Sequence, residues 1–198
     1  MNDFLIYLGL GFDHITDPGG YDHILFVIAL CAVYTLREWR PVLMLVTAFT
    51  LGHSITLALA TLRLVSFRSD LIELLIPITI LITAVVNFFY REQADRTVAP
   101  AGRWGRYGLA LAFGLIHGLG FSTYLRSLLG READIVTPLL AFNVGLELGQ
   151  LLIVAVVLSA AYVVLSTLRL RRRDWVLMVS GVVAGMAISL ILNNPFVA

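Results

Sequence analysis

Charged residues are scarce in this sequence, and so are cysteines. Only 14% of the 198 residues are charged, whereas a soluble domain is usually about one quarter charged. Apolar residues make up 59% of the chain, and the mean hydropathy is +0.90. The charges stand in short clusters between long apolar runs. This composition predicts a helical membrane protein rather than a soluble domain.

The lack of cysteine and of excess charge also limits the possible partners. A single cysteine, Cys31, excludes an internal disulfide, and thiolates are not expected as metal ligands. The formal net charge is only +1, and no basic stripe is interleaved with aromatic residues. No nucleic-acid partner is therefore expected.

Long apolar stretches divide the chain into candidate membrane spans. A span needs about 20 apolar residues, and six stretches meet or approach this length. They are 20–36, 41–62, 71–90, 106–128, 137–167 and 174–192. The shorter apolar run Phe4–Phe12 predicts an interfacial or re-entrant helix. We expect an all-α polytopic membrane protein, with one bundle domain over residues 1–198.

The arginines predict the orientation of this bundle. Ten arginines fall on one side of the predicted spans and four on the other. The four are Arg63, Arg68, Arg126 and Arg131. Because cytoplasmic loops carry the excess of positive charge, the side with ten faces the cytoplasm. We therefore expect a bacterial-type inner (plasma) membrane protein that crosses several times, with both termini on the outer face.

Near the N-terminus the sequence repeats a short phrase. The units Phe12–Ile15 and Tyr21–Ile24 both read aromatic-Asp-His-Ile, and Pro18-Gly19-Gly20 forms a hinge between them. A carboxylate beside an imidazole can hold the ring and attract a cation. We expect Asp13, His14, Asp22 and His23 to form an outward-facing capture site for a metal ion.

Three ionisable residues lie inside the predicted spans, where a charge is costly without partners. Each lies about 15–18 Å along its helix, at 1.5 Å per residue, from the start of its span. They are His53, His117 and Glu147. This common depth, near the middle of the bilayer, predicts a second metal site. A single such histidine is as often only an interhelical hydrogen-bonding group.

Polar neighbours lie on the same helix faces as these three residues. Asn143 and Gln150 share a stripe with Glu147, Thr50 and Ser54 lie beside His53, and Asn87 is on the third span. We expect them to support the metal ligands. The plainer interpretation of the hydroxyl groups is a hydrogen bond to their own helix.

Four segments carry a family resemblance. They are Gly20–Phe26, Thr47–Leu57, Phe113–Phe121 and Phe142–Gln150. Together they resemble the HupE/UreJ family, small membrane proteins regarded as nickel or cobalt permeases that serve hydrogenase and urease. The resemblance is closest to the broader branch of that family. It implies a functional set of Asp22, His23, His53, His117, Asn143, Glu147 and Gln150. One departure is Val86-Asn87, where an acidic residue is expected before the Asn.

The leading interpretation is a permease for a divalent transition metal, nickel or cobalt, with zinc also suited to these ligands. In this reading the protein is not an enzyme, its environment is the lipid bilayer, and it forms a homo-oligomer. The alternative is an intramembrane zinc hydrolase using the same histidines, with Asp22 as base. Haem ligation by His53 and His117 and a purely structural membrane subunit are further alternatives.

Overall fold

The computed structural model describes residues 3–65, 67–90, 100–129 and 135–197, and no strand occurs among them. Its helices are α1 (Asp3–Thr16), η1 (Pro18–Gly20), α2 (Asp22–Cys31), η2 (Leu36–Glu38), α3 (Trp39–Thr61), α4 (Ser69–Phe88), α6 (Pro100–Leu129), α7 (Val136–Thr167) and α8 (Arg172–Leu192). The expected all-α architecture is confirmed. In the described residues, four segments are long and apolar enough to cross a membrane: Leu36–Thr61, α4, α7 and α8.

The first predicted span differs most from the structure. Where a helix over residues 20–36 was expected, α2 covers only Asp22–Cys31, and a turn separates it from α1, which contains the expected short helix Phe4–Phe12. Pro18 has no backbone N–H to donate and disfavours a helical conformation at Asp17. The Asp17 carboxylate accepts a hydrogen bond from the Gly19 N–H at 2.8 Å, which fixes the turn. The apolar run predicted to lie at the membrane face therefore belongs to a helix that leads into the bundle.

At its other end, α2 stops because the next helix begins with its own cap. The Glu38 carboxylate accepts hydrogen bonds from the backbone N–H of Thr35 at 3.0 Å and from its hydroxyl at 2.9 Å. This capping box requires an extended Thr35, which cannot continue α2. Arg172 at the start of α8 donates a hydrogen bond to the Glu38 carboxylate at 2.6 Å and so connects α8 to η2.

Glycines allow α3 and α6 to pack with their backbones in contact. A Cβ atom added to Gly52 would collide with the Leu111 carbonyl, and one added to Gly114 would collide with the Phe49 carbonyl. Such close approach is typical of small-residue crossings between membrane helices. It sets the depth of the residues that follow on each helix, including the two intramembrane histidines.

The same kind of crossing joins α1 to α7. A Cβ atom on Gly145 would collide with the Leu8 carbonyl, and one on Gly11 would collide with the Phe142 carbonyl. The short helix α1 is thereby fixed against the long helix α7, although it could not span a membrane by itself.

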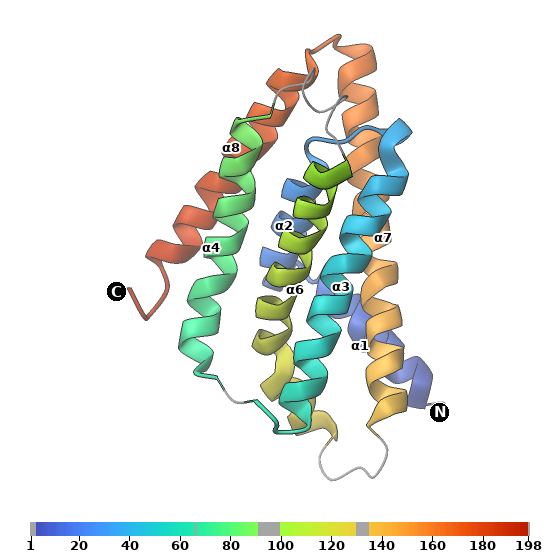
Figure 1. Ribbon diagram of the computed structural model, residues 1–198, viewed down its shortest axis with the longest axis vertical. Helices are drawn as coiled ribbons and strands as arrows, with labels where there is room; N and C mark the ends of the chain where they lie inside the picture. The colour runs from blue at the N-terminus through green and yellow to red at the C-terminus, as the bar shows by residue number, and fades with distance from the viewer. Residues whose placement is uncertain (1–2, 66, 91–99, 130–134, 198) are drawn as a thin grey trace.

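Figure 1 shows the directions in which these helices run. With the helix axes roughly vertical, α3, α6 and α8 run downward along the chain, while α2, α4 and α7 run upward. Helix α2 lies in the centre of the bundle and is largely buried: Phe26 packs against Phe49 and Phe113 in the main apolar core. The outer faces of the long helices carry exposed apolar side chains, such as Leu148 and Val182, as expected for a surface in lipid.

Candidate metal centre

Three histidines converge where α1, α2 and α3 meet. One ring nitrogen from each of His14, His23 and His53 lies within 4.8 Å of the other two. The ring centroids of His14 and His23 are 4.6 Å apart, and that of His53 is 6.1 Å from His14. His23 and His53 are buried, and His14 is partly buried. Residues 14 to 53 of the sequence thus provide one compact group of imidazoles.

His117 on α6 extends this group. Its ring centroid lies 5.3 Å from that of His23, and its side chain is fully buried. The ring Nδ1 of His117 donates a hydrogen bond to the Phe113 carbonyl at 2.8 Å. This bond assigns the proton to Nδ1 and leaves a lone pair on Nε2. That Nε2 has no hydrogen-bond partner among the described residues.

Asp22 likewise fixes the ring proton of His23 on Nδ1. Its carboxylate oxygen is 2.9 Å from the ring Nδ1, and an ionised carboxylate can only accept, so Nδ1 carries the proton. The Nε2 of His23 is then a free lone pair, buried and without a partner in the described structure. A histidine held through one nitrogen by a carboxylate is the usual arrangement of a metal-binding imidazole.

The ring of His53 makes no hydrogen bond within the described residues. Both of its ring nitrogens are buried and unpartnered, as is the Nε2 of His14. A buried polar atom without a partner costs about 1–3 kcal/mol, and such atoms are rare in native proteins. The convergence of such nitrogens from His14, His23 and His53, with His117 beside His23, is well suited to hold a metal ion.

Phenylalanine rings enclose the cluster. Phe142 stacks on His53 with ring centroids 6.4 Å apart, Phe121 lies 3.9 Å from His14, and Phe49 lies 5.1 Å from His117. These apolar walls were not expected from the sequence as part of the site. The spacing Phe-x-x-x-His, which recurs at Phe49 and His53 and at Phe113 and His117, places each Phe one turn before its His.

The remaining carboxylates occupy different places. Glu147 accepts a hydrogen bond from the Thr47 hydroxyl at 2.7 Å and is not in the histidine group. Asp13 is exposed and lines a cavity of about 450 Å³ that reaches His14, together with Asp17 and Tyr124. The structure thus brings His14 and His23 from the expected capture site into contact with His53 and His117, and leaves Asp13 in the opening.

The expected supporting residues also differ in their hydrogen-bond partners. Gln150 accepts a hydrogen bond from the Thr50 hydroxyl at 2.7 Å and leaves its own amide nitrogen buried and unpartnered in the described structure. The buried side-chain oxygen of Asn143, Oδ1, likewise has no hydrogen-bond partner in the described structure. Ser54 bonds the backbone of its own helix at 2.6 Å. Asn87 donates to the Ala29 carbonyl at 2.8 Å, and so ties α4 to α2.

Comparison with protein families gives a match over nearly the whole chain. Neither the curated proteins nor the solved structures yielded a match to this chain. The family described as HupE / UreJ protein matches residues 1–194, which include every residue of the histidine cluster. The chain therefore belongs to the HupE/UreJ family.

Proposed function

We propose that this protein carries a divalent transition-metal ion, nickel or cobalt, across the membrane, and that His14, His23 and His53 bind the ion on its way. The observation that carries this proposal is the convergence of buried imidazole nitrogens without partners. Family membership supports a transport function of this type. The ion is the transported substrate, and the cluster binds it transiently.

The donor set selects the class of metal. Neutral imidazole suits Ni²⁺, Co²⁺ and Zn²⁺, whereas Mg²⁺ and Ca²⁺ prefer oxygen and Cu(I) prefers sulfur. The lone Cys31 is buried among aliphatic side chains in a different part of the core, next to Val27 and Val42. Nitrogen is therefore the main ligand atom, with Asp22 supplying negative charge from behind His23.

The spacing of the cluster fits a transient site. Metal–nitrogen bonds of about 2.0–2.1 Å would place tetrahedral ligand atoms about 3.3 Å apart. The three nitrogens here lie within 4.8 Å of one another, so the rings must close inward around an ion. A site that must contract to bind gives up part of its binding energy, which favours release. The adjoining cavity at His14 provides a route to the cluster.

We propose six membrane crossings for this bundle. The 30-residue helix α6 is about 45 Å long at 1.5 Å per residue, enough for a full crossing. Helices α1 and α2 together make one further crossing, broken at Pro18. Arginines at the α2–α3 connection and at the start of α8 favour a cytoplasmic position for these ends and an outer position for both termini. The exposed apolar faces of the long helices are available to lipid or to a second copy in a homo-oligomer.

Glu147 is proposed as a proton carrier rather than a ligand. It lies near the cluster helices on α7, half-buried, and its carboxylate is held by the Thr47 hydroxyl. An intramembrane carboxylate in a transporter commonly takes up and releases protons. Metal binding needs neutral imidazoles, so binding and proton release are linked. The hydrolase alternative gains no support, since the base it requires, Asp22, is engaged with His23.

Uptake into liposomes tests the proposal. Purified protein in proteoliposomes should accumulate radioactive nickel or cobalt, and His23→Ala should abolish that accumulation. Val182→Ala, which shortens an exposed side chain of α8, is the matched control and should transport normally. Equal uptake by wild type, His23→Ala and protein-free liposomes would contradict the proposed function.

A further inference from the structure

The glycine crossing of α3 with α6 and that of α1 with α7 have the same pattern of contacts. Gly52 meets the carbonyl oxygen of Leu111 in the α3–α6 pair, and Gly145 meets that of Leu8 in the α1–α7 pair. Gly145 follows Gly52 by 93 residues, and Leu111 follows Leu8 by 103. A single matched contact could arise by chance, but the second contact in each pair repeats it.

In that second contact the same shifts apply. Gly114 meets the carbonyl of Phe49, and Gly11 meets the carbonyl of Phe142. Phe142 follows Phe49 by 93 residues, and Gly114 follows Gly11 by 103. Helix α3 therefore corresponds to α7, and α1 corresponds to α6, position by position. The shift of 103 also takes His14 to His117, so the two histidines occupy equivalent places.

The remaining long helices correspond as well. Each of the five buried residues of α8 lies 104 residues after a buried residue of α4, as Ile72 and Val176, and Thr83 and Ala187, illustrate. Because buried positions record which face of a helix packs inward, this agreement means that α4 and α8 present equivalent faces. They also pack against each other.

Corresponding helices run in opposite directions. In Figure 1, α3 and α8 run downward, whereas their counterparts α7 and α4 run upward. Helix α6 runs downward as one continuous helix of 30 residues, while α2, which continues α1 after the turn, runs upward. The stretch from Asp3 to Cys31 is thus the counterpart of α6, interrupted at Pro18–Gly20. Inverted repeats with one broken helix at the binding site are a common plan of secondary transporters.

We propose that the chain is an inverted repeat of two three-helix units, α1–α2 with α3 and α4, and α6 with α7 and α8, and that His14 and His117 are equivalent ligands that open to opposite sides of the membrane in alternation. This inference rests on the proposed function for the identity of the ion. The repeat itself stands on the helix contacts, the buried positions and the helix directions (Figure 1), and needs no ion.

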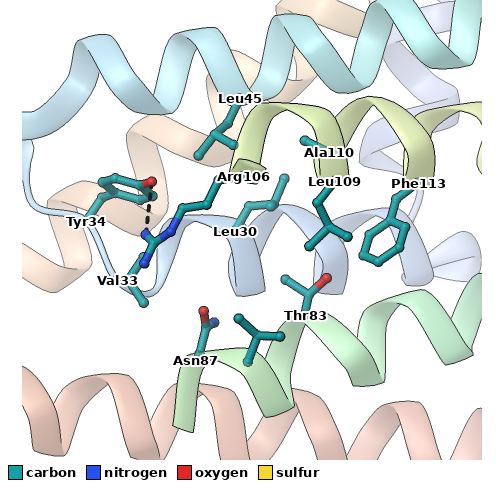
Figure 2. A pocket seen from close by; sticks show the side chains of 11 residues that line it. Leu30, Val33, Tyr34, Leu45, Thr83, Asn87, Arg106, Leu109, Ala110 and Phe113 are labelled. Carbon is teal, nitrogen blue, oxygen red and sulfur yellow. Dashed lines mark hydrogen bonds between the residues drawn. The ribbon is translucent and has the colours of Figure 1, made fainter. Parts of the chain in front are cut away.

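Two cavities of unequal size, toward opposite ends of α6, support the alternation. Leu10 lines the cavity of about 450 Å³ at His14, and Phe113, which follows it by 103 residues, lines a second cavity. The second cavity measures only about 40 Å³ and lies toward the other end of α6. Figure 2 shows Arg106 beside it, donating a hydrogen bond to the Tyr34 hydroxyl at 3.2 Å.

In the proposed cycle, the difference between the two cavities corresponds to a state that is open at His14. The cavity of about 450 Å³ reaches His14, whereas the lining of the small cavity includes Phe113 but not His117, which packs against Phe26 and Phe49. A guanidinium at the closed end repels a divalent cation until the Arg106–Tyr34 contact moves away. Exchange of the two conformations between the repeats would close the cavity at His14, open the one at Phe113, and pass the ion from His14 to His117.

Cysteine labelling tests this inference. Leu10→Cys and Phe113→Cys are introduced together in a Cys31→Ala background and reconstituted into liposomes. A bulky membrane-impermeant maleimide added from one side should label Leu10→Cys, and added from the other side should label Phe113→Cys. Prior labelling at Leu10→Cys should then reduce labelling at Phe113→Cys at least fivefold, because the first adduct holds the open side open.

Two further variants control this experiment. Leu5→Cys, exposed on α1 and outside the cavity lining, should accept the reagent without changing the labelling at residue 113. Ala110→Cys is a milder reporter of the same inner cavity if Phe113→Cys does not fold. Labelling of both positions from one side, or labelling of the second unaffected by the first, would overturn the alternation. Neither readout needs a metal ion, so a failure of the proposed cargo would not mimic either result.

Discussion

Asp22 and His23 are adjacent in sequence, and the Asp22 carboxylate accepts a hydrogen bond from the His23 ring at 2.9 Å. This contact directs the opposite ring nitrogen into the cluster with His14 and His53. The sequence contains a second unit of the same kind, but Asp13 is exposed and forms no hydrogen bond to His14 in the described structure. The two nearly identical units thus differ in role: Asp22 holds a candidate metal-binding histidine, whereas Asp13 lines the cavity that leads to the cluster.

Asp22→Asn should weaken metal binding about 10- to 100-fold, the usual effect of removing a carboxylate behind a metal-binding imidazole. The amide keeps a hydrogen-bond acceptor but removes the negative charge. Asp13→Asn, the matched change in the other unit, should alter affinity less than about twofold because that carboxylate is in water. Titration calorimetry with nickel compares the two variants. Equal losses would mean that both units hold the ion in the same way.

His53→Leu should abolish tight metal binding without destabilising the metal-free protein. Both ring nitrogens of His53 are buried and unpartnered in the described structure, so an apolar side chain of similar size removes a cost of about 1–3 kcal/mol. Leu146 already occupies the equivalent position on α7. Thermal unfolding in detergent should show a melting temperature at or above that of the wild type, with no further rise on adding nickel. A large loss of stability would show that His53 is structural.

Gly114→Ala and Gly11→Ala should destabilise the protein by similar amounts, each about 1–3 kcal/mol, because the added methyl group meets a helix backbone that cannot move aside. Gly181→Ala on α8 has nothing within 4 Å of the new atom and should stabilise by about 0.5–1 kcal/mol through helix propensity. Thermal unfolding of the three variants checks the order. A neutral Gly11→Ala beside a harmful Gly114→Ala would argue against equivalent crossings.

Glu147→Gln should leave nickel affinity within about twofold of the wild type, because this side chain is not among the clustered ligands. Gln can still accept the hydrogen bond from Thr47 but cannot carry a proton. Transport should therefore become slow and lose its response to a pH gradient. Uptake measured with and without that gradient distinguishes this role from ligation, which predicts a loss of binding instead.

The sequence predicted the helices well where one element makes a whole span. The expected spans 41–62, 71–90, 106–128, 137–167 and 174–192 correspond closely to α3, α4, α6, α7 and α8, because long apolar runs with charged ends leave little choice. The first expected span, 20–36, was too long, since α2 ends at Cys31 and hydropathy alone does not record where a helix ends. Pro18 signalled the break, but not that α1 continues into the bundle beside α7.

The sequence indicated candidate residues for the site but not their arrangement. His53 and His117 stand out in the sequence because an ionisable side chain within a membrane span costs free energy unless it has a partner. That His14 and His23 join them depends on the turn at Pro18–Gly20 and on the backbone contact of Gly11 with α7, which no local pattern reports. Depth along the helix placed Glu147 at the same level, yet its side chain projects toward Thr47.

Cobalt titration of the purified protein tests the central claim most directly, since Co²⁺ bound by imidazole absorbs visible light. The account predicts one Co²⁺ per chain, nitrogen ligation in the X-ray absorption spectrum, ready removal by a chelator, and no signal in His53→Leu. Absence of a cobalt spectrum in the wild type, or an unchanged spectrum in His53→Leu, would contradict a metal site in this cluster.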